Sequence, residues 1–383
     1  MSDFHQSGLI TTLHRLPGAV PLEISRELAR PVTLVIPAHG SEFGTAAFDA
    51  ILDVLSGCDF LQRFFLVMNE VSEDQVHLLR ERLRGFAIPS HLVLPTSGAF
   101  ADILQLQNPV RSGKGLNLWA GLLFSSELEP DAAVICHDAD IIAYDRNFLK
   151  RLAFPMAHPD LDYQFAKGFY PRVSEERFYG RVTRLFVAPL LRSLIRVLGH
   201  MPLLDFLDDF RYLLAGEFAL ASESVKAMRV PLGWGAEIGM LAEAFRHLEP
   251  SQICQVDLGS NYQHKHQAVG TPGQPGGLAA MCEEITVTLF TELGREGVAL
   301  PSEIQLAILH SYQRNVTDAI RRFQDDARYN GVVYPYAEEE QMGVIFAEAL
   351  RRGCERFTEG VTYAPALSAV TQAQRRQLVE SWA

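Results

Sequence analysis

Long apolar runs are missing from this chain of 383 residues. It has no stretch of about 18 consecutive apolar residues, so no transmembrane helix is predicted. The first residues, MSDFHQSGLITTLHRLPG, lack a basic segment followed by an apolar core, so no signal peptide is expected. The five cysteines are scattered, odd in number and without a C-x-x-C pair. This usage favours a reduced, cytoplasmic protein over a disulfide framework.

Basic charge is also scarce. The chain has 34 lysines and arginines against 46 acidic residues, which gives a net charge of −12. A nucleic-acid-binding surface is therefore not expected, although one basic pocket would suffice for a nucleotide. The sequence also lacks G-x-G-x-x-G and G-x-x-x-x-G-K-[ST], so it contains neither a dinucleotide fingerprint nor a P-loop.

From about Pro31 onward, where ordered structure is expected to begin, apolar runs of strand length alternate with segments of helical periodicity. Strands are predicted at 32–38, 63–68, 91–94 and 132–136, and helices around 48–55, 76–83 and 116–123. Ser72 to Gln75 has the pattern of a capping box, and Gly85 is expected to end that helix. This alternation predicts an α/β fold, a mainly parallel sheet with helices on both faces.

Two aspartates follow the strand predicted at 132–136. Asp138 and Asp140 flank Ala139, and in open α/β sheets ligands gather at the carboxyl ends of strands. Paired carboxylates there suit a hard divalent cation that also binds substrate phosphates. A lone D-x-D is more often an ordinary loop and helix cap, so the interpretation depends on other motifs.

A glycine-flanked lysine precedes the helix predicted at 116–123. At Gly113-Lys114-Gly115 the backbone N–H groups and the helix dipole favour an anion, and the lysine adds a point charge. A flexible, solvated loop is the alternative. The D-A-D that follows after one more helix and strand makes the combination more specific than either motif.

More motifs follow in a fixed order. The chain contains Pro37-Ala38, S-G-K-G-x-N-x-W-A-G around Lys114, D-A-D, K-G-F-Y-P-R from Lys167, G-R-V-T from Gly180, L-A-G-E from Leu214, G-W-G-A-E from Gly233 and H-K-H from His264. The first three resemble the nucleotide-sugar domain of GT-A glycosyltransferases. The whole series, over roughly residues 31 to 267, resembles the glucosyl-3-phosphoglycerate synthase family.

This resemblance implies a GT-A type, Rossmann-like sheet and a retaining transfer of glucose from a nucleotide sugar to 3-phosphoglycerate. UDP-glucose is the expected donor; a GDP- or ADP-sugar, mannose, or glycerate as acceptor are alternatives. The resemblance also implies Mg²⁺ or Mn²⁺, with Asp140 and His264 as ligands. Relative to the family's usual spacing, one residue is inserted between Gly259 and His264, so His266 stays an alternative ligand.

The motifs and the resemblance together assign the site residues. Donor-binding residues are Pro37, Ala38, Glu42, Gly113, Lys114, Asp138, Ala139, Leu214 and Glu237. Acceptor-binding residues are Gly180, Arg181, Thr183, Trp234 and His266, and Asp140, Glu237 and Lys114 are the expected catalytic residues. An arginine fork suits a phosphate or carboxylate, although a helix-start cap with a surface arginine would show the same G-R-V-T pattern.

Several positions stay open. Glu217 and Glu237 could both bind sugar hydroxyls, with Glu237 preferred, and no nucleophile is assigned. Lys167 and Arg172 belong either to the pocket or to a solvated edge. The loop after Ala38 lacks the family's usual Asn-Glu-Glu, so Glu42 is a displaced candidate for the ribose and the nucleobase is open. Trp234 stands where the family usually has a tyrosine.

Four parts of the chain are expected: an extension over 1–30, a nucleotide-sugar half over 31–145, an acceptor half over 146–270 and a helical region over 271–383. The apolar segment at 186–210 is predicted as core or dimer contact, because Arg192 and Arg196 interrupt it. Helices are expected around 281–289, 308–323 and 338–350. The helical region has no chemical motif, and it is expected to form a cap and the surface of a homodimer.

Two other functions fit the sequence less well. A sugar-phosphate nucleotidyltransferase would normally begin with a loop like G-x-G-T-R, and no such loop follows Ile36. A non-catalytic binding protein would not need Lys114, both aspartates and the histidines together. The sequence therefore favours the transferase.

Overall fold

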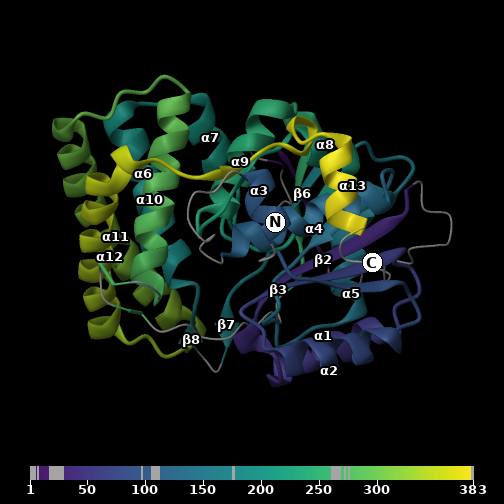
Figure 1. Cartoon of the computed structure of the whole chain (residues 1–383). Helices are drawn as coiled ribbons and strands as arrows, with labels where there is room; N and C mark the ends of the chain where they lie inside the picture. The colour runs from purple at the N-terminus through teal and green to yellow at the C-terminus, as the bar shows by residue number, and fades with distance from the viewer. Residues whose placement is uncertain are drawn as a thin grey trace.

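The fold is built around one eight-stranded sheet (Figure 1). The computed structural model describes residues 6, 8–16, 30–95, 98–104, 113–174, 177–259, 269–270, 273–274 and 277–380. The strand order is β1 (Thr11–Leu13), β11 (Ile253–Asp257), β6 (Phe165–Phe169), β9 (Phe218–Ala221), β5 (Ala133–Cys136), β2 (Val32–His39), β3 (Arg63–Asn69) and β4 (Ser90–Val93). Strand β9 is antiparallel to β5 and β6, and the remaining neighbours are parallel. The predicted mainly parallel sheet is confirmed.

Helices cover both faces of the sheet. Side chains along a strand point alternately to opposite faces, so each buried strand supplies apolar side chains to a core on either face. In β2, Leu34 and Ile36 join a core with α1 (Ala46–Ser56), α2 (Glu73–Arg84) and α5 (Arg146–Ala157). Val35 points to the other face and joins a core with α4 (Lys114–Leu128). The prediction of helices on both faces is confirmed.

Local signals set the ends of α2 as expected. Ser72 and Gln75 form the predicted capping box, and Gly85 ends the helix.

One expectation was wrong, because ordered structure does not begin at Pro31: β1 already pairs with β11 at the sheet edge. A strand of three residues is too short to show periodicity, so only its pairing reveals it.

A helical layer stands beside the sheet, formed by α6 (Ala188–Leu198), α10 (Gly277–Arg295), α11 (Ser302–Asn330) and α12 (Tyr336–Arg356), as Figure 1 shows. Leu190, Leu191 and Leu194 are buried and α6 packs on α11, so this apolar segment is core, one of the two roles expected for it. Among the described residues, no helix has both the length and the apolar character to cross a membrane.

Shorter elements connect these layers. They are α3 (Gly98–Leu104), β7 (Val173–Ser174), β8 (Arg177–Phe178), the π-helix η2 (Val182–Val187), α7 (Pro202–Asp208), α8 (Ser222–Ala227), β10 (Val230–Pro231), α9 (Ala236–His247), β12 (Tyr363–Ala364) and α13 (Gln372–Glu380). The last two bring the end of the chain back to the sheet (Figure 1). Strand β12 pairs with β10, the Trp119 indole of α4 donates to the Pro365 carbonyl at 2.8 Å, and α13 packs on α4.

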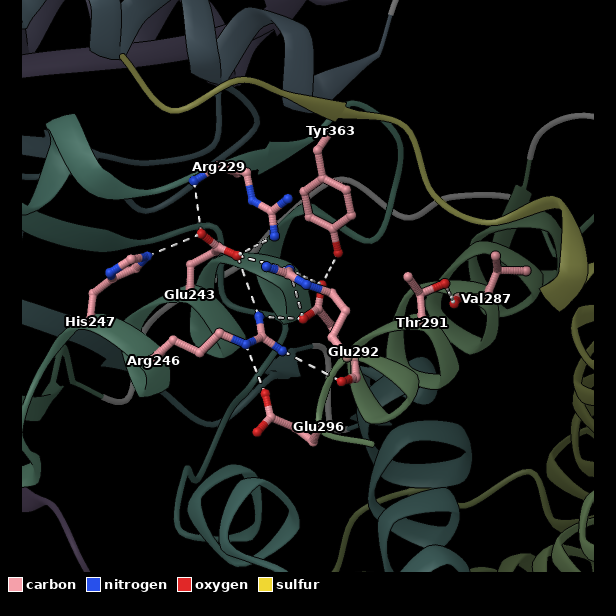
Figure 2. Close-up of polar contacts among 10 residues, drawn as sticks. Arg229, Glu243, Arg246, His247, Val287, Thr291, Glu292, Glu296 and Tyr363 are labelled. Atoms are coloured by element: carbon pink, nitrogen blue, oxygen red, sulfur yellow. Dashed lines mark hydrogen bonds and ion pairs between the residues drawn. The ribbon is translucent and has the colours of Figure 1, made fainter. Parts of the chain in front are cut away.

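A buried group of charged residues joins α9, α10 and β12 (Figure 2). This α9–α10 cluster consists of Arg229, Glu243, Arg246, Glu292, Arg295, Glu296 and Tyr363. Glu243 and Glu292 are almost fully buried, and each contacts at least two of the arginines. Three arginines contact three glutamates, and the His247 imidazole also lies 3.5 Å from Glu243.

Candidate active site

A cavity opens where the chain turns after β5. Asp138 and Asp140 line it, together with Lys114 from the start of α4 and Glu237 from the first turn of α9. The two aspartates are half-buried, whereas Glu237 is buried. Residues predicted from three separate motifs are therefore brought to one place at the carboxyl end of a central strand.

Lys114 lies between two carboxylates. Its Nζ is 2.5 Å from Asp138 Oδ1 and 2.5 Å from Glu237 Oε1. Burial acts to lower the pKa of Lys114, but Asp138 and Glu237 outweigh burial and raise that pKa well above its usual value. Lys114, which the sequence predicts to add a positive charge for an anion, is therefore charged. It is ion-paired with two protein carboxylates.

Lys114 contacts two carboxylates, those of Asp138 and Glu237, so negative charge exceeds positive charge in this ion-paired group, and Asp140 lines the same cavity. Carboxylate oxygens with an excess of negative charge fit a hard divalent cation such as Mg²⁺ or Mn²⁺. Of the predicted metal ligands, Asp140 lines the cavity, while His264 and His266 lie outside the described residues. Within the described ranges, no group of three or more His, Cys, Asp or Glu side chains is arranged to hold a metal.

Four of the predicted acceptor residues line the same cavity. Gly180 has a φ of +68°, a left-handed conformation that favours glycine, and the chain turns there into η2. Thr183 lies in this π-helix, and such turns are frequent at functional sites. Gly180, Arg181, Thr183 and Trp234 all line the same cavity as Asp140.

The predicted donor residues divide into two groups. Leu214 lines the cavity with Lys114, Asp138 and Glu237. Pro37, Ala38, Glu42, Gly113 and Ala139 are not among its described lining residues. Pro37 and Ala38 lie near the carboxyl end of β2, which neighbours β5, and Glu42 follows in the short helix η1 (Gly40–Glu42). These residues therefore lie beside the cavity, at the same edge of the sheet.

Two charged residues of the motifs lie beneath the cavity. Lys167 is fully buried in β6 and donates to the Ala215 carbonyl at 2.6 Å, and burial lowers its pKa to about 8. A solvated edge was therefore the wrong alternative for Lys167, because β6 is an internal strand. Glu217 is also buried and accepts a hydrogen bond from the Tyr170 hydroxyl at 2.7 Å. Glu237, which lines the cavity, is better placed than Glu217 to meet a sugar.

Sequence reasoning missed several lining residues, namely Tyr170, Tyr179, Val182, Tyr212, Leu278 and Met281. Arg172, left open above, also lines the cavity and is hydrogen-bonded to Tyr212. Burial acts to lower the pKa of Arg172, but Tyr212 and Tyr170 outweigh it and raise that pKa, so the guanidinium stays charged. Leu278 and Met281 come from α10, in the region for which no chemical role was predicted. No local motif could reveal them, because their place depends on how α10 packs.

Known proteins match this chain closely enough to show its family, although no family model matches it. A glucosyl-3-phosphoglycerate synthase of Persephonella marina is 32% identical over 385 residues, covering 96% of this chain and 94% of that protein. One from Methanococcoides burtonii is 32% identical over 370 residues, covering 93% and 90%.

Solved structures agree with these matches. The glucosyl-3-phosphoglycerate synthase of Mycobacterium tuberculosis, in complex with Mn²⁺, UDP and glucosyl-3-phosphoglycerate, is similar with a TM-score of 0.54 and 27% identity, covering 75% of this chain and 88% of that one. The same enzyme with Mg²⁺ and UDP matches with a TM-score of 0.53. The expected GT-A type fold is confirmed. With near full-length relatives at 32% identity, the chain belongs to the glucosyl-3-phosphoglycerate synthase family.

Proposed function

We propose that this protein transfers glucose from UDP-glucose to 3-phosphoglycerate and makes glucosyl-3-phosphoglycerate, with retention of configuration at the anomeric carbon. The observation that carries this proposal is one cavity lined both by the carboxylates after β5 and by the turn at Gly180 to Thr183. The carboxylates suit a metal-bound diphosphate, and Arg181 in the turn suits a small anion. Relatives of the same family have been solved with Mn²⁺ or Mg²⁺ and UDP.

On the donor side, Asp140 and His264 are the proposed ligands of Mg²⁺ or Mn²⁺. Such an ion stabilises the negative charge of the leaving diphosphate as a Lewis acid. Glu237, fixed by Lys114, is proposed to accept hydrogen bonds from sugar hydroxyls. Pro37, Ala38 and Glu42 lie at the neighbouring strand end, where we place the nucleoside.

On the acceptor side, Arg181 and Thr183 are proposed to bind the phosphate or carboxylate of 3-phosphoglycerate at Gly180. Arg172 adds a second cation to the same cavity. Holding the acceptor there brings its hydroxyl to the anomeric carbon and removes much of the entropic cost of the encounter. We propose no covalent nucleophile, because Glu237 is ion-paired with Lys114 and Glu217 is buried beneath the cavity.

A matrix of nucleotide sugars against 3-phosphoglycerate and glycerate tests this function, scored by release of nucleoside diphosphate. UDP-glucose with 3-phosphoglycerate should give the fastest release, and EDTA should abolish it until Mg²⁺ or Mn²⁺ is restored. Faster turnover with a GDP- or ADP-sugar, or with glycerate, would show that the donor or acceptor is wrongly assigned. Release of pyrophosphate from a nucleoside triphosphate and a sugar phosphate would instead identify a nucleotidyltransferase.

We also propose a homodimer that uses the outer side of α11 and α12. A surface groove between them is lined by Leu309, Val316, Ile320 and Val344, and Val344 is 70% exposed. Light scattering should give twice the chain mass for the wild type and a single chain mass for Val344→Glu; a monomeric wild type refutes this.

A cytoplasmic location is proposed too, and five free thiols, four of them buried, support it.

A further inference from the structure

The proposed acceptor arginine is held by a helix that belongs to the helical layer. Arg181 donates from Nε to Glu339 Oε1 at 2.8 Å, and its Nη2 lies 3.2 Å from Glu338 Oε2. Both glutamates are in the first turn of α12. The acceptor wall of the cavity is therefore supported from a part of the chain in which the sequence showed no chemical motif.

Glu339 is buried and shared between two arginines. Its side chain is 1% exposed, and Arg184 Nη1 donates to its Oε2 at 3.0 Å. Arg184 is itself anchored, because its Nε donates to the Tyr179 carbonyl at 2.8 Å and its guanidinium lies 4.6 Å from the centre of the Phe323 ring. A buried carboxylate that is paired with the anchored Arg184 has little freedom to move, because leaving its partners would leave a buried charge uncompensated.

This arrangement leaves part of Arg181 for a ligand. In the described part of the chain, its hydrogen bonds and ion pairs use Nε and Nη2, and a guanidinium carries five N–H donors. Arg181 lines the cavity together with Arg172, which supplies a second positive charge there. Both features suit an anionic group of the acceptor.

We propose that Glu339 is a positioning residue for acceptor binding, which fixes the guanidinium of Arg181 so that the anionic group of the acceptor meets a preset donor fork. Without this carboxylate, ordering the long arginine side chain would reduce acceptor affinity. The inference rests on the proposed acceptor role of Arg181. Glu338 serves as the matched comparison, because its side chain is 61% exposed and its contact with Arg181 is longer and screened by water.

The test measures acceptor and donor KM for Glu339→Gln, alone and combined with Arg181→Ala. Glu339→Gln should raise the KM for 3-phosphoglycerate about tenfold, which corresponds to about 1.4 kcal/mol, and leave the KM for UDP-glucose within about twofold. In the Arg181→Ala background it should cause no further rise. Glu338→Gln should change the acceptor KM by less than about twofold. If Glu339→Gln does not fold by its melting curve, Glu339→Asp replaces it, since it keeps the charge and shortens the reach.

Other outcomes separate the possible failures. Loss of thermal stability and kcat with no selective rise in acceptor KM would overturn the proposal, because that pattern indicates a structural role only. An equal rise with and without Arg181 would also overturn it, because Glu339 would then act independently. If Arg181→Ala itself leaves the acceptor KM unchanged, the acceptor site in the proposed function is wrong as well.

Discussion

The two ends of α9 hold buried glutamates in different electrostatic surroundings. Glu237, in the first turn, lies in the cavity, where Lys114 is the partner of both Glu237 and Asp138. Glu243, nearer the other end, belongs to the α9–α10 cluster and contacts Arg229, Arg246 and Arg295 (Figure 2). In the cavity one lysine is shared by two carboxylates, whereas in the α9–α10 cluster three arginines contact three glutamates.

This difference separates binding from stability. A buried charge is costly unless a partner compensates it. The α9–α10 cluster is complete by itself and fastens α9, α10 and β12 together, so its residues should matter for folding. The cavity is complete only when a cation joins its carboxylates, so its residues should matter for turnover.

The largest expected effect comes from removing a carboxylate where negative charge is in excess. Asp140→Ala should reduce kcat roughly 1000-fold, about 4 kcal/mol in the activation barrier, because the leaving diphosphate loses its metal-assisted stabilisation. The melting temperature should change little, because Asp140 is only half-buried. UDP release at saturating Mn²⁺ measures the change, and Asp131→Asn, exposed just before β5, is the control. Turnover within twofold of wild type would contradict the assignment.

The sharpest test of the comparison pairs two substitutions on one helix. Glu237→Gln should lower kcat/KM about 100-fold and change the free energy of unfolding by less than about 1 kcal/mol, because Lys114 keeps Asp138 as its partner. Glu243→Gln should cost about 3 kcal/mol of stability, because it leaves three arginines short of a buried negative charge, and should leave kcat/KM within about threefold.

Urea denaturation and steady-state kinetics on both variants decide between these expectations. The comparison fails if both substitutions lose activity to the same degree. It also fails if Glu237→Gln proves the more destabilising of the two.

Motifs contiguous in the sequence predicted the parts of the site that follow from local structure. Asp138 and Asp140 end a strand and Lys114 begins a helix, and both signals lie within a few residues. Their meeting with Arg181 and Glu237 in one cavity needed the resemblance, because no periodicity tells which strand ends lie together.

Residues supplied by packing could not be predicted. Glu339 and Glu243 look like ordinary helix-surface acids in the sequence, and only the approach of η2 and α10 buries them. Leu278 and Met281 reach the cavity for the same reason. The return of β12 to β10 is equally non-local, since two paired residues on each side leave no pattern.

A pH dependence of stability is expected from the α9–α10 cluster. Burial raises the pKa of Glu292 to about 7 from its model-peptide value of 4.5, although Arg246 acts to lower it. Between these two pH values the folded state holds a proton that the unfolded chain has released. The contribution of Glu292 to the free energy of unfolding therefore falls as pH rises from about 4.5 to about 7 and is constant above. The loss should be on the order of 2 to 3 kcal/mol. Free energies of unfolding measured from pH 5 to 8 give this loss. If Glu292→Gln showed the same slope against pH as the wild type, the pH dependence would come from another group.

The smallest expected effect is that of Tyr363→Phe. The Tyr363 hydroxyl donates to Glu292, and its ring lies 5.2 Å from the Arg229 guanidinium and 5.5 Å from that of Arg295. Phenylalanine keeps the ring contacts and loses one hydrogen bond, so the cost should be about 1 kcal/mol. Tyr363 also pairs with Pro231, whose carbonyl lies so close to Gly115 that a Cβ there would meet it at 1.8 Å. If Tyr363→Phe changed the KM for UDP-glucose, the α9–α10 cluster and the cavity would be coupled through β10. The separation of binding from stability would then not hold.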